Sequence, residues 1–179
     1  MAIAANIIII VLEVIGLSLS FRRSRWRMLQ FYTQLSNIIA LLSSLLFLFA
    51  AEKAAWLRFT GVCMLIMTFF VTLLILVPMG AGFKKMMLTN SGLFHHTLCP
   101  ILSAASYILW EPHTTLWVIP VVLTFIYGMI MLCLNWKEIV DGPYPFFRVR
   151  HQSALATVLW YIALIAAILL ISFALIRIT

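Results

Sequence analysis

The sequence predicts an all-α, polytopic membrane protein in which residues 1–179 form a single bundle of six transmembrane helices. The 179 residues are 65% hydrophobic and only 9% charged, whereas a soluble domain carries about a quarter charged residues. The mean hydropathy is +1.14. The apolar runs are continuous rather than alternating, which favours helices over a β-barrel, the other structure whose backbone pairs fully in hydrocarbon.

Six apolar runs are each close to the roughly 20 residues that a helix needs to cross a bilayer core of about 30 Å. The first run starts near the N-terminus without a basic segment ahead of it or a cleavage site behind it, unlike a secretory signal. The predicted spans are residues 2–20, 29–50, 55–78, 91–110, 115–135 and 153–176.

The basic residues are concentrated in the loops after the first, third and fifth spans. The positive-inside rule therefore puts these loops in the cytoplasm and both termini outside. Because the net charge of +7 is explained by topology, we expect no nucleic-acid partner. The loop cations are Arg22, Arg23, Arg25, Arg27, Lys84, Lys85, Lys137, Arg148 and Arg150, against Lys53, Arg58 and Arg177 on the opposite side.

Polar residues recur at helical spacing in three of the spans, which marks the faces that we expect to be turned away from lipid. The third and sixth spans are nearly featureless, and we expect them to wall the bundle. The polar faces consist of Asn6, Glu13, Gly16 and Ser20 in the first span, Gln30, Thr33, Gln34, Asn37 and Ser44 in the second, and Pro120, Thr124, Tyr127, Gly128 and Asn135 in the fifth.

Two histidines, His95 and His96, lie about one turn inside the fourth span. An ionisable side chain at membrane depth indicates function by default, although an interhelical hydrogen bond is an equally simple explanation. Adjacent helical residues point about 100° apart, so the two rings cannot share one small site or hold one metal. Pro100 leaves the carbonyl of His96 without its donor, which predicts a distorted helix lining a cavity. The three cysteines have no metal-like spacing, and we expect neither a metal nor a cofactor.

Glu13 is the only acidic residue near the middle of a span. Its carboxyl is either packed and hydrogen-bonded between helices or acts as an orienting or proton-carrying group. Together with His95 it makes a small transporter or proton-coupled carrier one candidate function. That function requires a water path to both faces, which the apparently featureless outer half of the bundle disfavours.

Three features converge just below the predicted cytoplasmic surface. Thr33 lies about 9 Å along its helix from Arg27, at 1.5 Å per residue. His95 enters the membrane from the same face, and the loop 141–147 hangs from it. Taken alone, a membrane threonine most simply bonds the carbonyl one turn back. Glu13 is expected about 14 Å along its helix from Arg22, deeper in the membrane, where it would support such a site from below.

Three segments resemble the androgen-induced-protein family of multipass membrane proteins and its bacterial relatives. They are FYTQLSN at 31–37, LFHHTLCP at 93–100 and YPFF at 144–147. The eukaryotic members are intramembrane threonine hydrolases that cleave fatty acid esters of hydroxy fatty acids. The resemblance implies that Thr33 is the nucleophile and that His95, five residues before Pro100, is the base.

The resemblance further implies a bacterial cytoplasmic membrane protein of lipid metabolism, with a membrane fatty acyl ester as its substrate. Supporting or substrate-binding roles fall on Asn37, Glu13, His96, Tyr127, Tyr144 and Phe146, with Tyr127 or Asn37 as the oxyanion donor. The bacterial relatives often carry an acidic residue after the Tyr-Pro-Phe loop, where this chain has Arg148. A non-catalytic lipid-binding protein is the remaining alternative, and it would tolerate loss of the Thr33 hydroxyl.

Overall fold

The computed structural model describes all 179 residues and contains helices but no strand. Each of the six predicted spans corresponds to a helical stretch. Short 3-10 helices lie at Arg25–Gln30 (η1), Pro145–Phe147 (η5) and Val149–His151 (η6). The long elements are α1 (Ala2–Ser24), α2 (Tyr32–Phe49), α3 (Ala51–Val71) continued by η2 (Thr72–Ala81), α4 (Asn90–Leu93) continued by η4 (Phe94–Leu98) and α5 (Cys99–Trp110), α6 (Val118–Trp136) and α7 (Ala154–Ile178).

Five of these stretches are long and apolar enough to cross a membrane: 2–30, 32–49, 51–81, 118–136 and 154–178. The helical stretch 90–110 is not among the five. It begins with Asn90 and Ser91 and contains both histidines of the fourth predicted span. By length and composition, these five helices are compatible with a multipass membrane protein.

Three segments are wound as π-helix: η2, η3 (Lys84–Leu88) and η4. Pro78 lies inside η2, and Pro100 is the second residue of α5, two positions after the end of η4. A proline removes one backbone donor and crowds the carbonyl four residues back, so a locally wider turn relieves both problems. The distortion expected at Pro100 is therefore present. Gly80 near the end of η2 and Gly82 directly after it, with φ of 95° and 79°, let the chain turn between η2 and η3.

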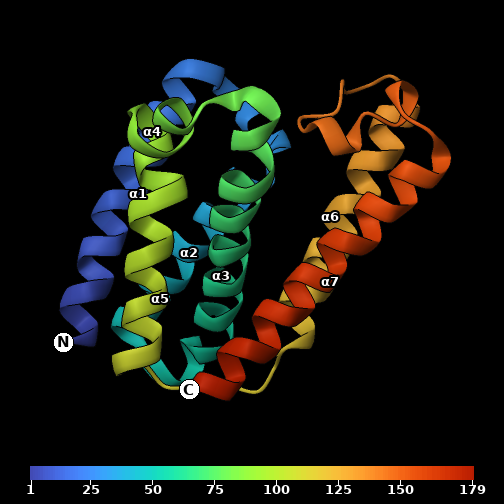
Figure 1. Ribbon diagram of the computed structural model, residues 1–179. Coiled ribbons are helices and arrows are strands. Elements are labelled where there is room, and N and C mark those ends of the chain that lie inside the picture. The colour runs from blue at the N-terminus through green and yellow to red at the C-terminus, as the bar shows by residue number, and fades with distance from the viewer.

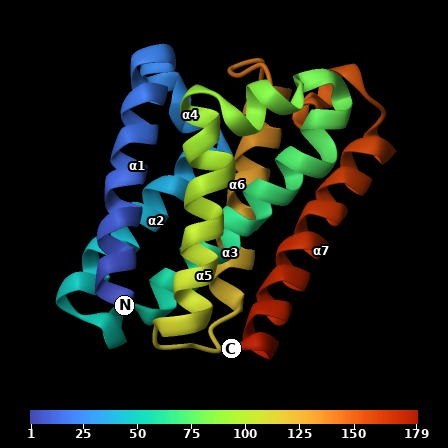
Figure 2. The ribbon, with the colours of Figure 1, turned by 60° about the vertical axis from the view of Figure 1, so that its left-hand side comes forward.

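The helices form two groups. Helices α1, α2, α3 and α5 pack around one another, and the α6–α7 hairpin packs against α3 (Figure 1). Figure 2 shows α1 and α7 on opposite flanks of the molecule. The hairpin leans away from α3 toward the end formed by segments 25–30, 82–90 and 137–153, which we call the basic end. The opposite end carries both chain termini, and we call it the termini end.

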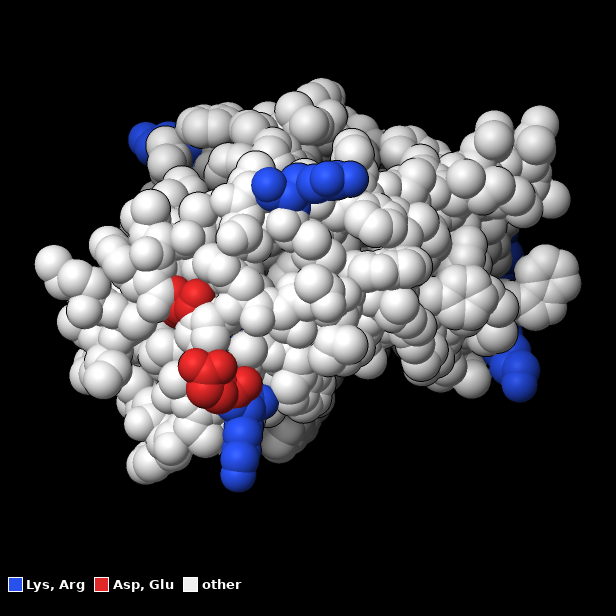
Figure 3. Space-filling model, turned by 90° about the horizontal axis from the view of Figure 1, so that it is seen from below, with Lys and Arg blue, Asp and Glu red and all other residues white.

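The polar faces expected from the sequence are turned inward, and apolar side chains cover the outside. The predicted inward residues of α1, α2 and α6 are buried, apart from Gln30, which is half-buried. In contrast, α7 exposes Leu155, Leu159, Ile162 and Leu170. Few charged side chains interrupt the uncharged surface of the termini end (Figure 3). This inverted distribution is compatible with a multipass membrane protein.

Candidate functional site

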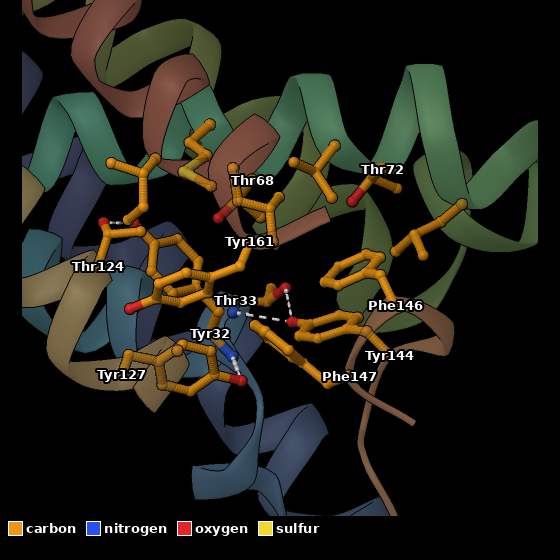
Figure 4. Close-up of a pocket in the computed structure, with 16 residues that line it drawn as sticks. Tyr32, Thr33, Thr68, Thr72, Thr124, Tyr127, Tyr144, Phe146, Phe147 and Tyr161 are labelled. Atoms are coloured by element: carbon orange, nitrogen blue, oxygen red, sulfur yellow. Dashed lines mark hydrogen bonds between the residues drawn. The ribbon is translucent and has the colours of Figure 1, made fainter. Parts of the chain in front are cut away.

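A pocket lies between the four-helix group and the α6–α7 hairpin, near the basic end (Figure 4). Its space, counting the open mouth, is about 470 Å³. Of its 16 lining residues 11 are hydrophobic, and none is charged or a histidine. The lining residues that carry a hydroxyl are Thr33, Thr68, Thr72, Thr124, Tyr32, Tyr127, Tyr144 and Tyr161. Such a lining suits an uncharged apolar group.

Thr33 lies in the first turn of α2 and contacts the loop that closes the pocket. Its Oγ1 is 3.2 Å from the hydroxyl of Tyr144, and its backbone N–H donates to the same oxygen over 3.3 Å. Burial raises the pKa of Tyr144, so this hydroxyl keeps its proton at neutral pH. Phe146 stacks on the Tyr144 ring with centroids 5.1 Å apart. The structure thus brings Thr33, Tyr144 and Phe146 together.

The two residues proposed as oxyanion donors are occupied elsewhere. The hydroxyl of Tyr127 donates to the carbonyl of Gln30 over 2.7 Å and accepts the N–H of Tyr32 over 3.0 Å. Its ring lines the pocket, but its polar end holds the turn before α2. The amide of Asn37 donates to the carbonyl of Thr33 over 2.6 Å and does not line the pocket. Tyr144 is the donor that actually lies at Thr33.

His95 faces α1 rather than the pocket. Its Nε2 is 3.0 Å from Ser20 Oγ, and its Nδ1 is 4.0 Å from a carboxyl oxygen of Glu13. The ring lies on Gly16, where a Cβ would come within 2.8 Å of His95 Cε1. No hydrogen bond joins His95 to Thr33, so the pair implied by the resemblance is not formed in this structure. The physical reason is that α1 and the pocket lie on different sides of the 90–110 helix.

His96 points to the other side, toward the pocket wall. Its Nδ1 is 2.9 Å from Thr72 Oγ1, and Thr72 lines the pocket. Both side chains are buried, at 7% and 1% exposure. A hydroxyl hydrogen-bonded to an imidazole is the arrangement that activates a hydroxyl as a nucleophile. Both residues also lie in π-helical turns, which occur frequently at functional sites.

Thr33 and Thr72 lie at the same depth on neighbouring helices. One layer deeper, the hydroxyls of Ser36 and Thr68 are 3.1 Å apart. Because α2 and α3 run antiparallel, one turn toward the basic end leads from Ser36 to Thr33 and from Thr68 to Thr72. The two threonines therefore face the same end of the pocket, although no hydrogen bond joins them.

Comparison with known proteins adds no further constraint. No family model, curated protein or solved structure matches the chain.

Sequence reasoning missed Thr72 because it belongs to a span that looked featureless. The available signal was the spacing Thr68–Thr72, four residues apart and therefore on one helical face, followed by Pro78. That spacing alone is common in membrane helices, where threonines bond the carbonyl one turn back, as Thr68 does to Met64 over 2.9 Å. Thr72 becomes a candidate site residue only when the structure shows that η2 contacts His96.

The termini end corrects the expectation of a featureless outer half. Arg58, assigned from the sequence to the outer surface, is 0% exposed and forms a two-pronged ion pair with Glu111, at 2.7 and 2.9 Å. The same carboxylate accepts hydrogen bonds from Asn6 at 2.9 Å and Ser106 at 2.5 Å. Arg58 also donates to Ser44 over 3.0 Å. The third span is thus polar where it meets α1, α2 and α5.

Proposed function

We propose that the chain is a six-span membrane protein that hydrolyses lipid esters inside the bilayer. Five helices qualify as spans by length and composition, and we count the 90–110 stretch, which packs against α1 and α3, as the sixth. Most Lys and Arg residues fall at the basic end, which the positive-inside rule assigns to the cytoplasm, with both termini outside. The pocket then opens just below the cytoplasmic headgroups of what we take to be a bacterial cytoplasmic membrane.

The observation that carries the proposal is the His96–Thr72 contact on the wall of an uncharged apolar pocket that also contains Thr33 and Tyr144. An acyl chain fits such a lining, whereas a charged group of the substrate finds no partner inside the pocket and would have to stay at its mouth, among the headgroups. The substrate class is therefore an ester of a long-chain fatty acid, and the resemblance narrows it to fatty acid esters of hydroxy fatty acids. Lateral entry from lipid would keep the chain in an apolar medium throughout.

In the proposed mechanism Thr33 Oγ1 attacks the ester carbonyl. Because no hydrogen bond joins the two threonines, a water molecule in the pocket would carry the Thr33 proton to the Thr72 hydroxyl. Thr72 gives its own proton to His96 Nδ1, so that His96 replaces His95 as the base. The imidazolium then protonates the leaving alcohol oxygen through the same relay. The acyl group bound to Thr33 is finally released by water. Tyr144 lies against Thr33 and supplies a neutral donor for the negative charge that develops on the carbonyl oxygen.

The proposal is tested by fluorophosphonate labelling of the detergent-purified protein, followed by mapping of the labelled peptide. We expect the label on Thr33 and its loss in Thr33→Val, with parallel loss of fatty acid release from a fatty acid ester of a hydroxy fatty acid. A label on Thr72 would still support hydrolase activity, but it would identify Thr72, the residue that contacts His96, as the nucleophile. A protein that is neither labelled nor active on esters would refute the proposal.

Tyr144→Phe is expected to lower kcat by about 10²–10³-fold, the usual effect of removing one oxyanion donor. The ring and its stack on Phe146 are preserved, so KM should change little. The kinetic constants for ester hydrolysis measure the effect. Tyr161→Phe is the matched control, because Tyr161 also lines the pocket but its hydroxyl donates to the carbonyl of Phe125. Equal losses in both variants would contradict the role of Tyr144.

A further inference from the structure

The four-helix group contains a second buried polar cluster that is separate from the pocket. Glu13 lies at its centre with 0% exposure, and the thiol of Cys99, a weak donor, is the only donor beside its carboxyl. His95 Nδ1, 4.0 Å away, is without a partner. Neither residue lines the pocket. A buried carboxyl whose only donor is a thiol is costly at membrane depth, and such groups commonly serve ion or proton pathways.

His95 connects this carboxyl to the basic end. One ring nitrogen faces Glu13, and the other lies 3.0 Å from the hydroxyl of Ser20. Ser20 is two turns closer than Glu13 to the basic end along α1, about 10 Å at 1.5 Å per residue. An imidazole accepts a proton at one nitrogen and releases one from the other. The ring is therefore placed to pass protons between Glu13 and the end of α1.

Polar groups continue from Glu13 toward the termini end. The thiol of Cys99 lies beside the carboxyl, and one turn farther along α5 the buried Ser103 hydroxyl has no partner. Ser106 follows and donates to Glu111 at the end of the helix. From His95 to Glu111 the helix rises about 24 Å, most of a hydrocarbon core of about 30 Å. The track thus approaches both ends of the bundle.

One apolar side chain interrupts the polar face of α1. Asn6, which donates to Glu111, and Glu13 lie on the same face, and Ile9 lies between them. Ile9 is fully buried, at 0% exposure. We identify it as the barrier between the Glu13 site and the network at the termini end.

We propose that helices α1, α2, α3 and α5 carry protons between the two ends of the bundle, with Glu13 and His95 as the central transfer pair. The Glu13 carboxyl gives its proton to His95 Nδ1, which leaves a carboxylate beside an imidazolium. The imidazolium releases the proton on Nε2 to the Ser20 hydroxyl, which passes its own proton on toward the basic end. Rotation of the ring restores its starting tautomer, and the Glu13 carboxylate takes up the next proton from the termini end. The other titratable or charged groups that act on the pair are His96, Cys99 and Arg58. This activity does not depend on the proposed hydrolysis.

The test is proton uptake by proteoliposomes of the full chain that contain a trapped pH-sensitive dye, driven by a potassium gradient with valinomycin. We expect wild type to acidify the lumen faster than protein-free vesicles. Glu13→Gln and His95→Gln should reduce the rate to that of protein-free vesicles, since each removes one member of the pair with little change in size. Glu138→Gln, an exposed acid at the basic end, should keep the wild-type rate.

Ile9→Ser is expected to increase proton uptake, and misfolding of the variant would not produce a gain that depends on Glu13. It should raise the uptake rate above wild type, and adding Glu13→Gln should abolish that gain. Wild-type uptake equal to that of protein-free vesicles would overturn the proposal. Uptake that Glu13→Gln leaves unchanged would do so too, because Glu13 would then be a packed carboxyl only. Gel-filtration and circular-dichroism profiles matching wild type confirm that each variant is folded.

Discussion

His96→Gln lowers ester hydrolysis by about 10²–10⁴-fold, the usual contribution of a general base, while His95→Gln keeps most of the activity. The physical reason is the direction of the two rings: His96 bonds a hydroxyl on the pocket wall, and His95 bonds Ser20 on the far side of the helix. The measurement is the initial rate of fatty acid release by each variant in nanodiscs, with wild type and Thr33→Val alongside.

The two histidine variants control for each other because they differ by one position and receive the same substitution. Thermal unfolding in detergent should be compared first, since both rings are buried and each makes one interhelical hydrogen bond. If His95→Gln loses hydrolysis while His96→Gln retains it, the base is the residue that the family resemblance implies. The helix would then have to rotate during catalysis to bring His95 to Thr33.

Breaking the buried ion pair at the termini end is expected to have the largest effect on stability. Glu111→Gln or Arg58→Met should lower the free energy of unfolding by about 3–5 kcal/mol, because each leaves an uncompensated charge in a dry interior. Asn6 and Ser106 would keep a partner in the Gln variant but lose the charge on it. The midpoint of thermal unfolding should fall by about 2–4 °C for each kcal/mol in a chain of this length.

The exposed pair Arg150–Glu138 is the matched control for this prediction. Its atoms are also 2.7 Å apart, but the two side chains are 37% and 70% exposed. Glu138→Gln should therefore change stability by at most about 1 kcal/mol. The double variant Arg58→Met, Glu111→Gln should cost less than the sum of the single changes, because the two side chains interact directly. Additive losses would show that the pair does not act as one unit.

The sequence by itself determined the class of fold and the faces of the helices. Continuous apolar runs predict membrane helices, and helical spacing of Asn6, Glu13 and Ser20 predicts which side of α1 is buried. Those properties are local: they depend on composition and on a period of 3.6 residues, which packing does not alter. The distortion at Pro100 followed for the same reason, since the missing donor belongs to the proline itself.

Only the tertiary structure decided which polar side chains meet. Adjacent histidines look equivalent in the sequence, yet one faces α1 and the other faces the pocket, because helices lie on both sides of that segment. Thr72 became a site residue and Arg58 a buried one only through the helices that pack beside them. Such contacts join residues distant in the chain, and their geometry depends on helix rotation and depth, which no local pattern specifies.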